Sequence, residues 1–185
     1  FGTLCTFSFH ACHDLNDRDL ALMRVFADMA TALIDEDVKR AQREERIRER
    51  LRGLLDGDEL SMVWQPIVDT SDQRIVGVES LSRFPAVRGL GPADWFDEAA
   101  EVGLADTLES RAVENALAAL DHLPETCFVA FNISGQALLR SGVASTLRGV
   151  DLNRVVLELT EHDVIEDYGG LTQALAPLRR QGLRL

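Results

Sequence analysis

The sequence predicts an α/β fold, because segments of strand-like and helix-like composition alternate along most of the chain. Strands are expected at 126–133 and 154–160, and helices at 92–102, 106–120, 136–147 and 170–181. Strands joined through helices form parallel βαβ units, so these strands should share one sheet. With 185 residues, of which 46% are hydrophobic, the chain has room for one domain and an appendage.

The first 34 residues predict a strand followed by an amphipathic helix. Residues 1–9 alternate in polarity, and Asn16 with Asp19 three positions later makes an approximate capping box. Apolar residues then recur at helical spacing, at Leu20, Met23, Ala27, Ala30 and Ile34. With Gly2-Thr3-Leu4-Cys5 in its strand, the segment resembles the last strand and last helix of a GAF sensory domain. The resemblance implies that 1–34 are the C-terminal remnant of such a domain, without the part that would hold a ligand.

Residues 35–57 are a dense run of charges and predict a helical linker. Two apolar stripes, one through Val38 and one through Leu51, are out of phase with each other. This pattern favours a solvated linker over a dimeric signalling coiled coil. Glycines at the end of the run, the last of them Gly57, are expected to end the helix, so that a new domain begins at residue 58.

The segment 62–84 predicts a β-hairpin whose second strand carries two charges on one face. Two apolar runs flank the polar turn 69–72. Because side chains alternate across a strand, Glu79, Leu81 and Arg83 share a face. Unpaired buried charges are costly, so an anionic or metallic partner is expected on that face.

The composition argues against several classes of partner. A formal net charge of −12 disfavours a nucleic-acid or membrane-surface binder, because phosphate backbones require a basic surface. No apolar run approaches the ~20 residues of a membrane helix, and no signal peptide is recognised. Cys5, Cys12 and Cys127 lack zinc-ligand spacing, so reduced thiols in a cytoplasmic protein are expected. Both ends fall inside apparent structural elements, which predicts that the chain is a piece of a longer protein.

Three apolar strand patterns end in a side chain that can bind a metal ion through oxygen. Glu79, Asn132 and Glu158 occupy these positions. Carboxylate and amide oxygens suit Mg²⁺, Mn²⁺ or Ca²⁺ better than zinc. One such residue could simply cap its strand or the next helix, whereas three in consecutive strands favour a shared site at the strand ends.

Four ordered motifs resemble those of EAL domains, bacterial phosphodiesterases that open cyclic di-GMP to linear pGpG. They are Gln65-Pro66-Ile67, Glu79-Ser80-Leu81-Ser82-Arg83, Phe131-Asn132-Ile133-Ser134 and Glu158-Leu159-Thr160-Glu161. The resemblance covers most of the chain and implies that 58–185 are the N-terminal part of a TIM-barrel-like EAL domain. The name-giving triplet has Ser80 where alanine is usual, at an outward-alternating position of the strand that leaves Glu79 in place.

The resemblance also implies a role for individual residues. The matching metal ligands are Glu79, Asn132 and Glu158, the matching catalytic acids are Glu79, Glu158 and Glu161, and the matching substrate contacts are Gln65, Leu81 and Arg83. Arg83 would contact a phosphate, and Glu161 would hold the following catalytic loop. The implied cofactor is Mg²⁺ or Mn²⁺ in a two-metal site. The family's Asp-Asp pair would follow Leu185, so the 185-residue fragment alone is expected to be inactive.

The leading functional hypothesis is a metal-dependent cyclic di-GMP phosphodiesterase that is regulated through the sensory remnant and the linker. The alternative is a non-catalytic EAL domain that acts as a cyclic di-GMP receptor, and a third hypothesis is a dimerisation scaffold. The expected partners are cyclic di-GMP and, through the linker helix or the EAL domain, a second copy of the chain.

Overall fold

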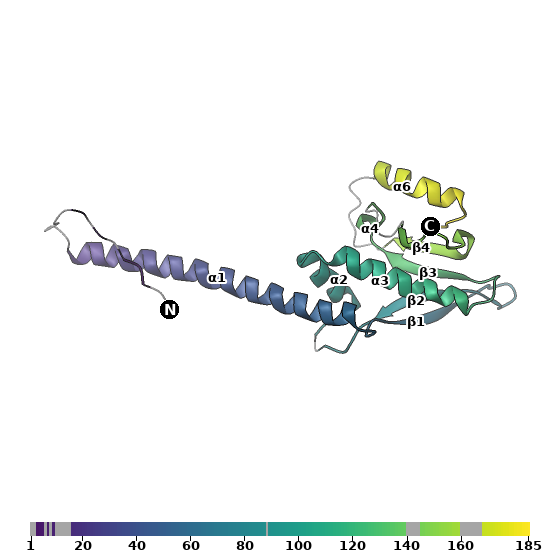
Figure 1. Ribbon diagram of the computed structural model, residues 1–185, viewed down its shortest axis with the longest axis horizontal. Helices are drawn as coiled ribbons and strands as arrows, with labels where there is room; N and C mark the ends of the chain where they lie inside the picture. Colours follow the sequence, from purple (N-terminus) through teal and green to yellow (C-terminus); the bar gives the residue numbers. More distant parts are fainter. Residues whose placement is uncertain are drawn as a thin grey trace. The chain divides into compact units, whose positions relative to one another are not determined.

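The computed structural model describes residues 3–5, 7, 9, 16–87, 89–139, 145–159 and 168–185 (Figure 1). The chain divides into two compact units, Phe1–Arg46 and Ile47–Leu185. Among the described residues, no helix combines the length and the apolar character needed to cross a membrane.

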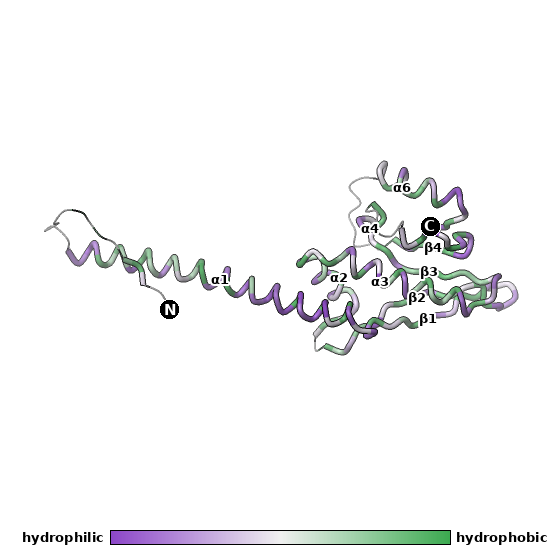
Figure 2. The backbone as a smooth tube through the Cα atoms, viewed as in Figure 1, coloured by the Kyte–Doolittle hydropathy of each residue, from purple (hydrophilic) through white to green (hydrophobic). Residues whose placement is uncertain are grey.

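Helix α1 (Asp17–Asp56) begins in the first unit with the predicted cap. The Asn16 side-chain oxygen accepts a hydrogen bond from the Arg18 N–H at 2.9 Å, and the Asp19 carboxylate accepts one from the Asn16 N–H at 3.0 Å. These contacts satisfy N–H groups that the first helical turn leaves without a partner. Figure 2 shows hydrophobic and hydrophilic turns mixed in the first half of α1, followed by a hydrophilic stretch.

The strand expected at 1–9 is not found in the described residues 3–5, 7 and 9. Phe7 and Phe9 are 82% and 91% exposed. A strand requires a neighbouring strand to complete its hydrogen bonds, and the four strands of the sheet all lie in the second unit. The GAF-like remnant therefore stays a prediction.

The last turns of α1 belong to the core of the second unit, in contrast to the solvated linker expected there. Ile47, Leu51 and Leu54 are at most 3% exposed and pack in one cluster with Trp95 and Leu108. The earlier stripe does not share this packing, since Val38 is 45% exposed. The helix continues through Gly53 and ends at Asp56, one residue before Gly57.

The sheet contains strands β1 (Ser61–Val68), β2 (Ile75–Arg83), β3 (Phe128–Ile133) and β4 (Val155–Leu159), in the order β1-β2-β3-β4. The first pair is antiparallel and the other pairs are parallel, which confirms the hairpin and the βαβ units. Arg184 exchanges backbone hydrogen bonds with Val155 and Leu157, so it forms a parallel β-bridge beside β4.

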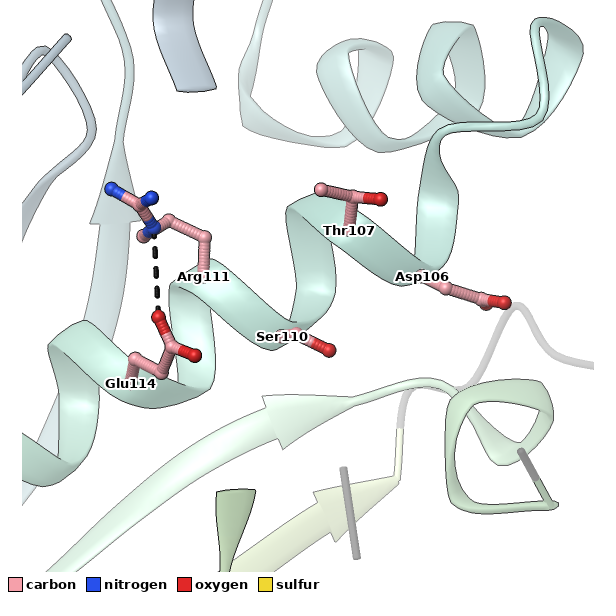
Figure 3. A pocket seen from close by; sticks show the side chains of 5 residues that line it. All are labelled: Asp106, Thr107, Ser110, Arg111 and Glu114. Carbon is pink, nitrogen blue, oxygen red and sulfur yellow. Dashed lines mark ion pairs between the residues drawn. The ribbon is translucent and has the colours of Figure 1, made fainter. Parts of the chain in front are cut away.

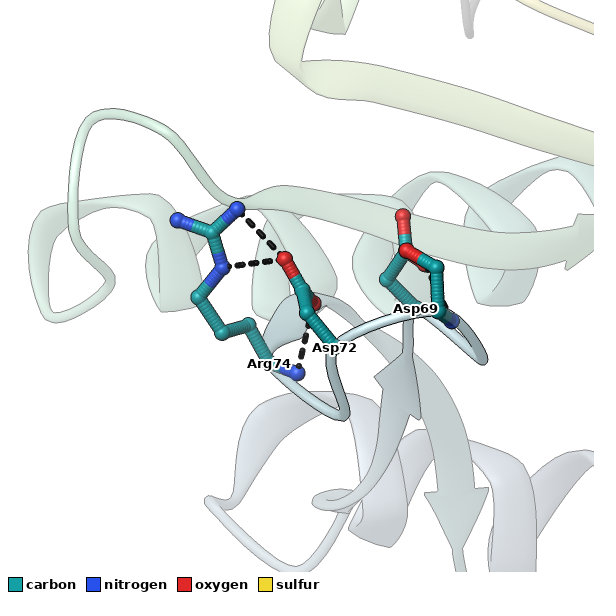
Figure 4. A network of polar contacts seen from close by, with 4 residues as sticks. Asp69, Asp72 and Arg74 are labelled. Atoms are coloured by element: carbon teal, nitrogen blue, oxygen red, sulfur yellow. Dashed lines mark hydrogen bonds and ion pairs between the residues drawn. The ribbon is translucent and has the colours of Figure 1, made fainter.

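The turn between β1 and β2 is held by its own polar side chains (Figure 4). The Asp69 carboxylate accepts hydrogen bonds from the Ser71 hydroxyl at 2.6 Å and the Ser71 N–H at 2.8 Å. The Asp72 carboxylate accepts one from the Arg74 guanidinium at 2.6 Å. Hydrogen bonds from Ser71 lower the pKa of Asp69, and those from Arg74 lower the pKa of Asp72.

The connecting helices are α2 (Pro92–Glu101), α3 (Ala105–Leu117), the 3₁₀ turn η1 (Ala118–Asp121), α4 (Gly135–Leu139), the 3₁₀ turn η2 (Leu152–Arg154) and α6 (Tyr168–Arg180). α2, α3 with η1, and α6 match the helices predicted at 92–102, 106–120 and 170–181, whereas α4 covers only the start of the segment predicted at 136–147. The main core forms between these helices and one face of the sheet, where Val129, Val155 and Leu157 are at most 1% exposed. The closed barrel implied by the EAL resemblance stays a prediction.

Candidate functional site

The sheet brings Glu79, Asn132 and Glu158 to one face. Asn132 pairs with Glu158 across β3 and β4, and Glu79 pairs with Ala130, two residues before Asn132. Residues paired across strands, and residues two apart on one strand, point to the same side. The Asn132 amide donates a hydrogen bond to Glu79 Oε1 at 3.2 Å. Side chains 53 residues apart in the sequence are therefore in direct contact.

The two carboxylates of this face influence each other. Partial burial raises the pKa of Glu158 above its ordinary value, and the negative charge of Glu79 raises it further. Two like charges on one partly buried face are unfavourable unless a cation or a proton lies between them. With the Asn132 amide oxygen, the carboxylates supply hard oxygen donors of the kind that Mg²⁺ and Mn²⁺ bind. These residues fit a divalent cation.

The predicted substrate contacts lie on the same face. Gln65 pairs with Glu79 across the hairpin, and Leu81 and Arg83 follow at two-residue steps along β2. Arg83 is exposed, and its guanidinium donates a hydrogen bond to the Ser82 carbonyl oxygen at 3.0 Å. A cationic side chain thus ends the strand that carries Glu79.

A close contact between Gly77 and Phe128, which was not predicted from the sequence, lies beside the acidic pair. The two residues pair across β2 and β3, and a Cβ atom at Gly77 would lie 2.7 Å from the Phe128 ring. The guanidinium carbon of Arg184 lies 4.3 Å from the centroid of the same ring. A glycine within a strand pattern often marks such a close approach, and that signal was present in the sequence.

Ser80 lies on the opposite face from Glu79, but it is buried, so the expected outward position is wrong. Its side chain is 3% exposed, and its hydroxyl has no hydrogen-bond partner among the described residues. This face is covered by helices, so a side chain that points away from the acidic site points into the core. The alanine usual at this position in the resembled family has no such polar group to satisfy.

Ser134 and Glu161 also belong to the four motifs. Ser134 caps helix α4, since its hydroxyl accepts a hydrogen bond from the Ala137 N–H at 3.0 Å and donates one to Glu109 at 3.0 Å. Glu161 lies outside the described residues, so its predicted role stays a prediction.

A shallow pocket on α3 does not coincide with the predicted site (Figure 3). It is lined by Asp106, Thr107, Ser110, Arg111 and Glu114, and its Arg111–Glu114 ion pair measures 3.6 Å. All five residues belong to one helix, and none was predicted to bind a ligand. Within the described ranges, no three histidine, cysteine, aspartate or glutamate side chains are grouped so that they could hold a metal ion. The candidate cation site therefore consists of two carboxylates and one amide.

The chain belongs to the EAL domain family, because the family model for the EAL domain matches residues 48–185. The match and the second compact unit both begin earlier than the boundary expected at residue 58. A Sinorhizobium fredii protein described as "Uncharacterized protein y4lL" is 30% identical over 158 residues, which cover 81% of this chain. The chain spans 19% of the length of that relative.

Solved structures share the fold. The FimX EAL domain of Xanthomonas citri, in complex with c-diGMP, has a TM-score of 0.64 and 21% identity over 77% of this chain and 60% of that one. The PaMucR phosphodiesterase, in complex with c-di-GMP, has a TM-score of 0.63 and 21% identity over 75% and 61% of the two chains. Klebsiella pneumoniae BlrP1, in a manganese and cy-diGMP complex, has a TM-score of 0.52 and 23% identity over 69% and 34%.

Proposed function

We propose that the full-length protein hydrolyses cyclic di-GMP to pGpG with a divalent metal ion. The observation that carries this proposal is the contact of Asn132 with Glu79 beside Glu158, on the face of the sheet that also presents Arg83. Membership of the EAL domain family and the cyclic di-GMP complexes of FimX and PaMucR support it. The proposal concerns the full-length protein because this chain spans only a fraction of the relatives it matches.

In this proposal Glu79, Asn132 and Glu158 hold Mg²⁺ or Mn²⁺ through oxygen atoms, and Glu161 holds the loop that follows β4. A divalent ion in such a site lowers the pKa of bound water and stabilises negative charge on the leaving oxygen. Arg83 would pair with a substrate phosphate, and Gln65 and Leu81 would contact the rest of the dinucleotide. Local positive charge from Arg83 and the metal offsets the acidity of a chain whose formal net charge is −12.

A cyclic di-GMP receptor is the second candidate function. Arg83 lies on the same face as Glu79, and in this alternative it pairs with a phosphate of cyclic di-GMP without any bond being cut. A homodimer and a cytoplasmic location stay predictions.

An assay of the full-length protein separates the two functions. Cyclic di-GMP is incubated with the protein and Mn²⁺ or Mg²⁺, product is measured by chromatography, and binding is measured by calorimetry. Metal-dependent formation of pGpG is expected. Binding without product would favour the receptor, and the absence of binding under all metal conditions would reject both functions.

A further inference from the structure

The end of β2 is packed against an aromatic stack. Phe84 directly follows Arg83, the last residue of β2, and its ring is stacked on Trp95 of α2 at a centroid distance of 5.2 Å and an interplanar angle of 9°. Phe96 contacts the Phe84 ring edge to face at 5.5 Å. The backbone that carries the Arg83 guanidinium therefore continues directly into a fixed aromatic ring.

The same tryptophan is in contact with α1. The guanidinium carbon of Arg50 lies 5.1 Å from the centroid of the Trp95 ring, and Arg50 forms an ion pair with Glu98. The Arg50 and Glu98 side chains are only 28% and 15% exposed, and Trp95 is 2% exposed. The positive charge of Arg50 is thus held in one place by a carboxylate and by the face of an aromatic ring.

These contacts form an uninterrupted series from α1 to the end of β2. Arg50 contacts Trp95, Trp95 contacts Phe84, and Phe84 is bonded to Arg83. A partly buried ion pair and a stacked aromatic pair tolerate few alternative arrangements, so we expect a change at Arg50 to move or loosen Phe84. Arg50 also belongs to a helix that begins at Asp17, in the first compact unit.

We propose that Arg50 is a positioning residue, which sets the orientation of Arg83 toward an anionic substrate through Trp95 and Phe84. The inference rests on the proposed role of Arg83 in binding a phosphate group. It assigns to the last turns of α1 a part in substrate affinity, beyond their part in the hydrophobic core. It also makes substrate affinity sensitive to any movement of α1 that withdraws Arg50.

The first experiment compares Arg50→Gln, Arg50→Lys and Arg46→Gln in the full-length protein. Arg46 lies one turn earlier on α1, is exposed, and contacts the carbonyl oxygen of Gln42 in its own helix, so it is the matched control. Arg50→Gln is expected to raise the KM or Kd for cyclic di-GMP about tenfold, with kcat within about twofold, a size typical of coupling through packed side chains. Arg50→Lys keeps the charge and should recover most of the affinity, and Arg46→Gln should behave as wild type.

A double-mutant cycle tests whether the effect passes through Arg83. In an Arg83→Ala background, Arg50→Gln should cause no further loss of affinity, because the side chain that it orients is gone. Additive losses would overturn the proposal, and so would an unchanged KM in Arg50→Gln alone. Phe84→Leu, which keeps an apolar side chain but removes the stack, provides a second variant if Arg50→Gln folds poorly.

A ligand-free measurement separates this inference from the proposed function. The backbone amide resonances of Arg83 and Phe84 are compared by NMR in wild type, Arg50→Gln and Arg46→Gln. Shifts confined to Arg50→Gln support the coupling, and unchanged resonances in both variants overturn it. Failure of the wild type to bind cyclic di-GMP would instead reject the proposed function and leave the resonance comparison as the test of the coupling.

Discussion

The two faces of the sheet are built from the same strands and differ in almost every property. On the helix-covered face, Val129, Val155 and Leu157 are buried and their neighbours are apolar. On the other face, Glu79 and Glu158 are partly exposed and Asn132 is exposed. Strand alternation assigns successive residues of one strand to these two environments. One set of alternate residues therefore stabilises the fold, and the other set is free to carry polar groups.

Ser80 is a polar residue on the helix-covered, apolar face. Its neighbours along β2, Glu79 and Leu81, are partly buried and lie on the other face. Substitutions on the polar face should therefore change mainly activity, and substitutions on the helix-covered face should change mainly stability.

The largest expected effect is on activity, from Glu79→Ala on the polar face of the full-length protein. Loss of a ligand carboxylate should lower cyclic di-GMP hydrolysis by more than about a hundredfold. Losing a residue that only hydrogen-bonds to a metal ligand costs up to about a hundredfold, and losing the ligand itself should cost more. Product formation with Mn²⁺ measures the effect. Glu125→Gln, at an exposed position before β3, is the control and should keep wild-type turnover. Near-normal turnover of Glu79→Ala would show that Glu79 is not a ligand.

Next in size is the loss of stability expected from Val129→Ala on the helix-covered face. Val129 is 0% exposed, so the substitution removes buried methyl groups and leaves a cavity, at a cost of about 2 kcal/mol. Val63→Ala is the matched change on the polar face, where Val63 is 46% exposed, and it should cost well under about 1 kcal/mol. Urea unfolding measures both. Equal losses would contradict the difference between the faces.

Glu158→Gln tests the repulsion on the polar face in metal-free protein. The raised pKa means that folded Glu158 keeps its proton at pH values where the unfolded chain has lost it. Its contribution to stability is therefore present at acidic pH and is lost as the pH rises through the raised pKa. Glu158→Gln should raise Tm at about pH 8 by a few degrees in EDTA, and the gain should shrink below about pH 4.

In the same experiment, Mn²⁺ should raise the Tm of wild type more than that of Glu158→Gln, because the neutral amide of the variant binds a cation more weakly than the carboxylate does. Glu125→Gln again serves as the control. A Tm gain that does not depend on pH would show that the two carboxylates do not repel each other in the folded protein.

The smallest effect is expected from Ser80→Ala. Removal of a buried hydroxyl without a described partner should leave stability unchanged or raise it by up to about 1 kcal/mol. Ser134→Ala is the matched serine and should lose about 1 kcal/mol, because its hydroxyl caps α4. Chemical denaturation of both variants measures whether the free energy of unfolding rises in Ser80→Ala and falls in Ser134→Ala. A clear loss in Ser80→Ala would indicate that the hydroxyl is satisfied in solution.

The sequence determined most elements of the second unit and the face of β2 on which Glu79, Leu81 and Arg83 lie. Period-two alternation placed Glu79, Leu81 and Arg83 together before any strand pairing was known. The polar turn after Val68 and the alternating strands and helices were likewise readable, because these signals depend on residues that are close in the chain. The ordered motifs indicated the family.

The tertiary structure alone decided which distant residues meet. It brought Asn132 into contact with Glu79, buried Ser80 beneath helices, and made the last turns of α1 part of the domain core. A helix that ends in a solvated linker and one that ends in a core carry similar local patterns. What distinguishes them is the presence of partners such as Trp95, which lie more than forty residues away and are brought close only by packing.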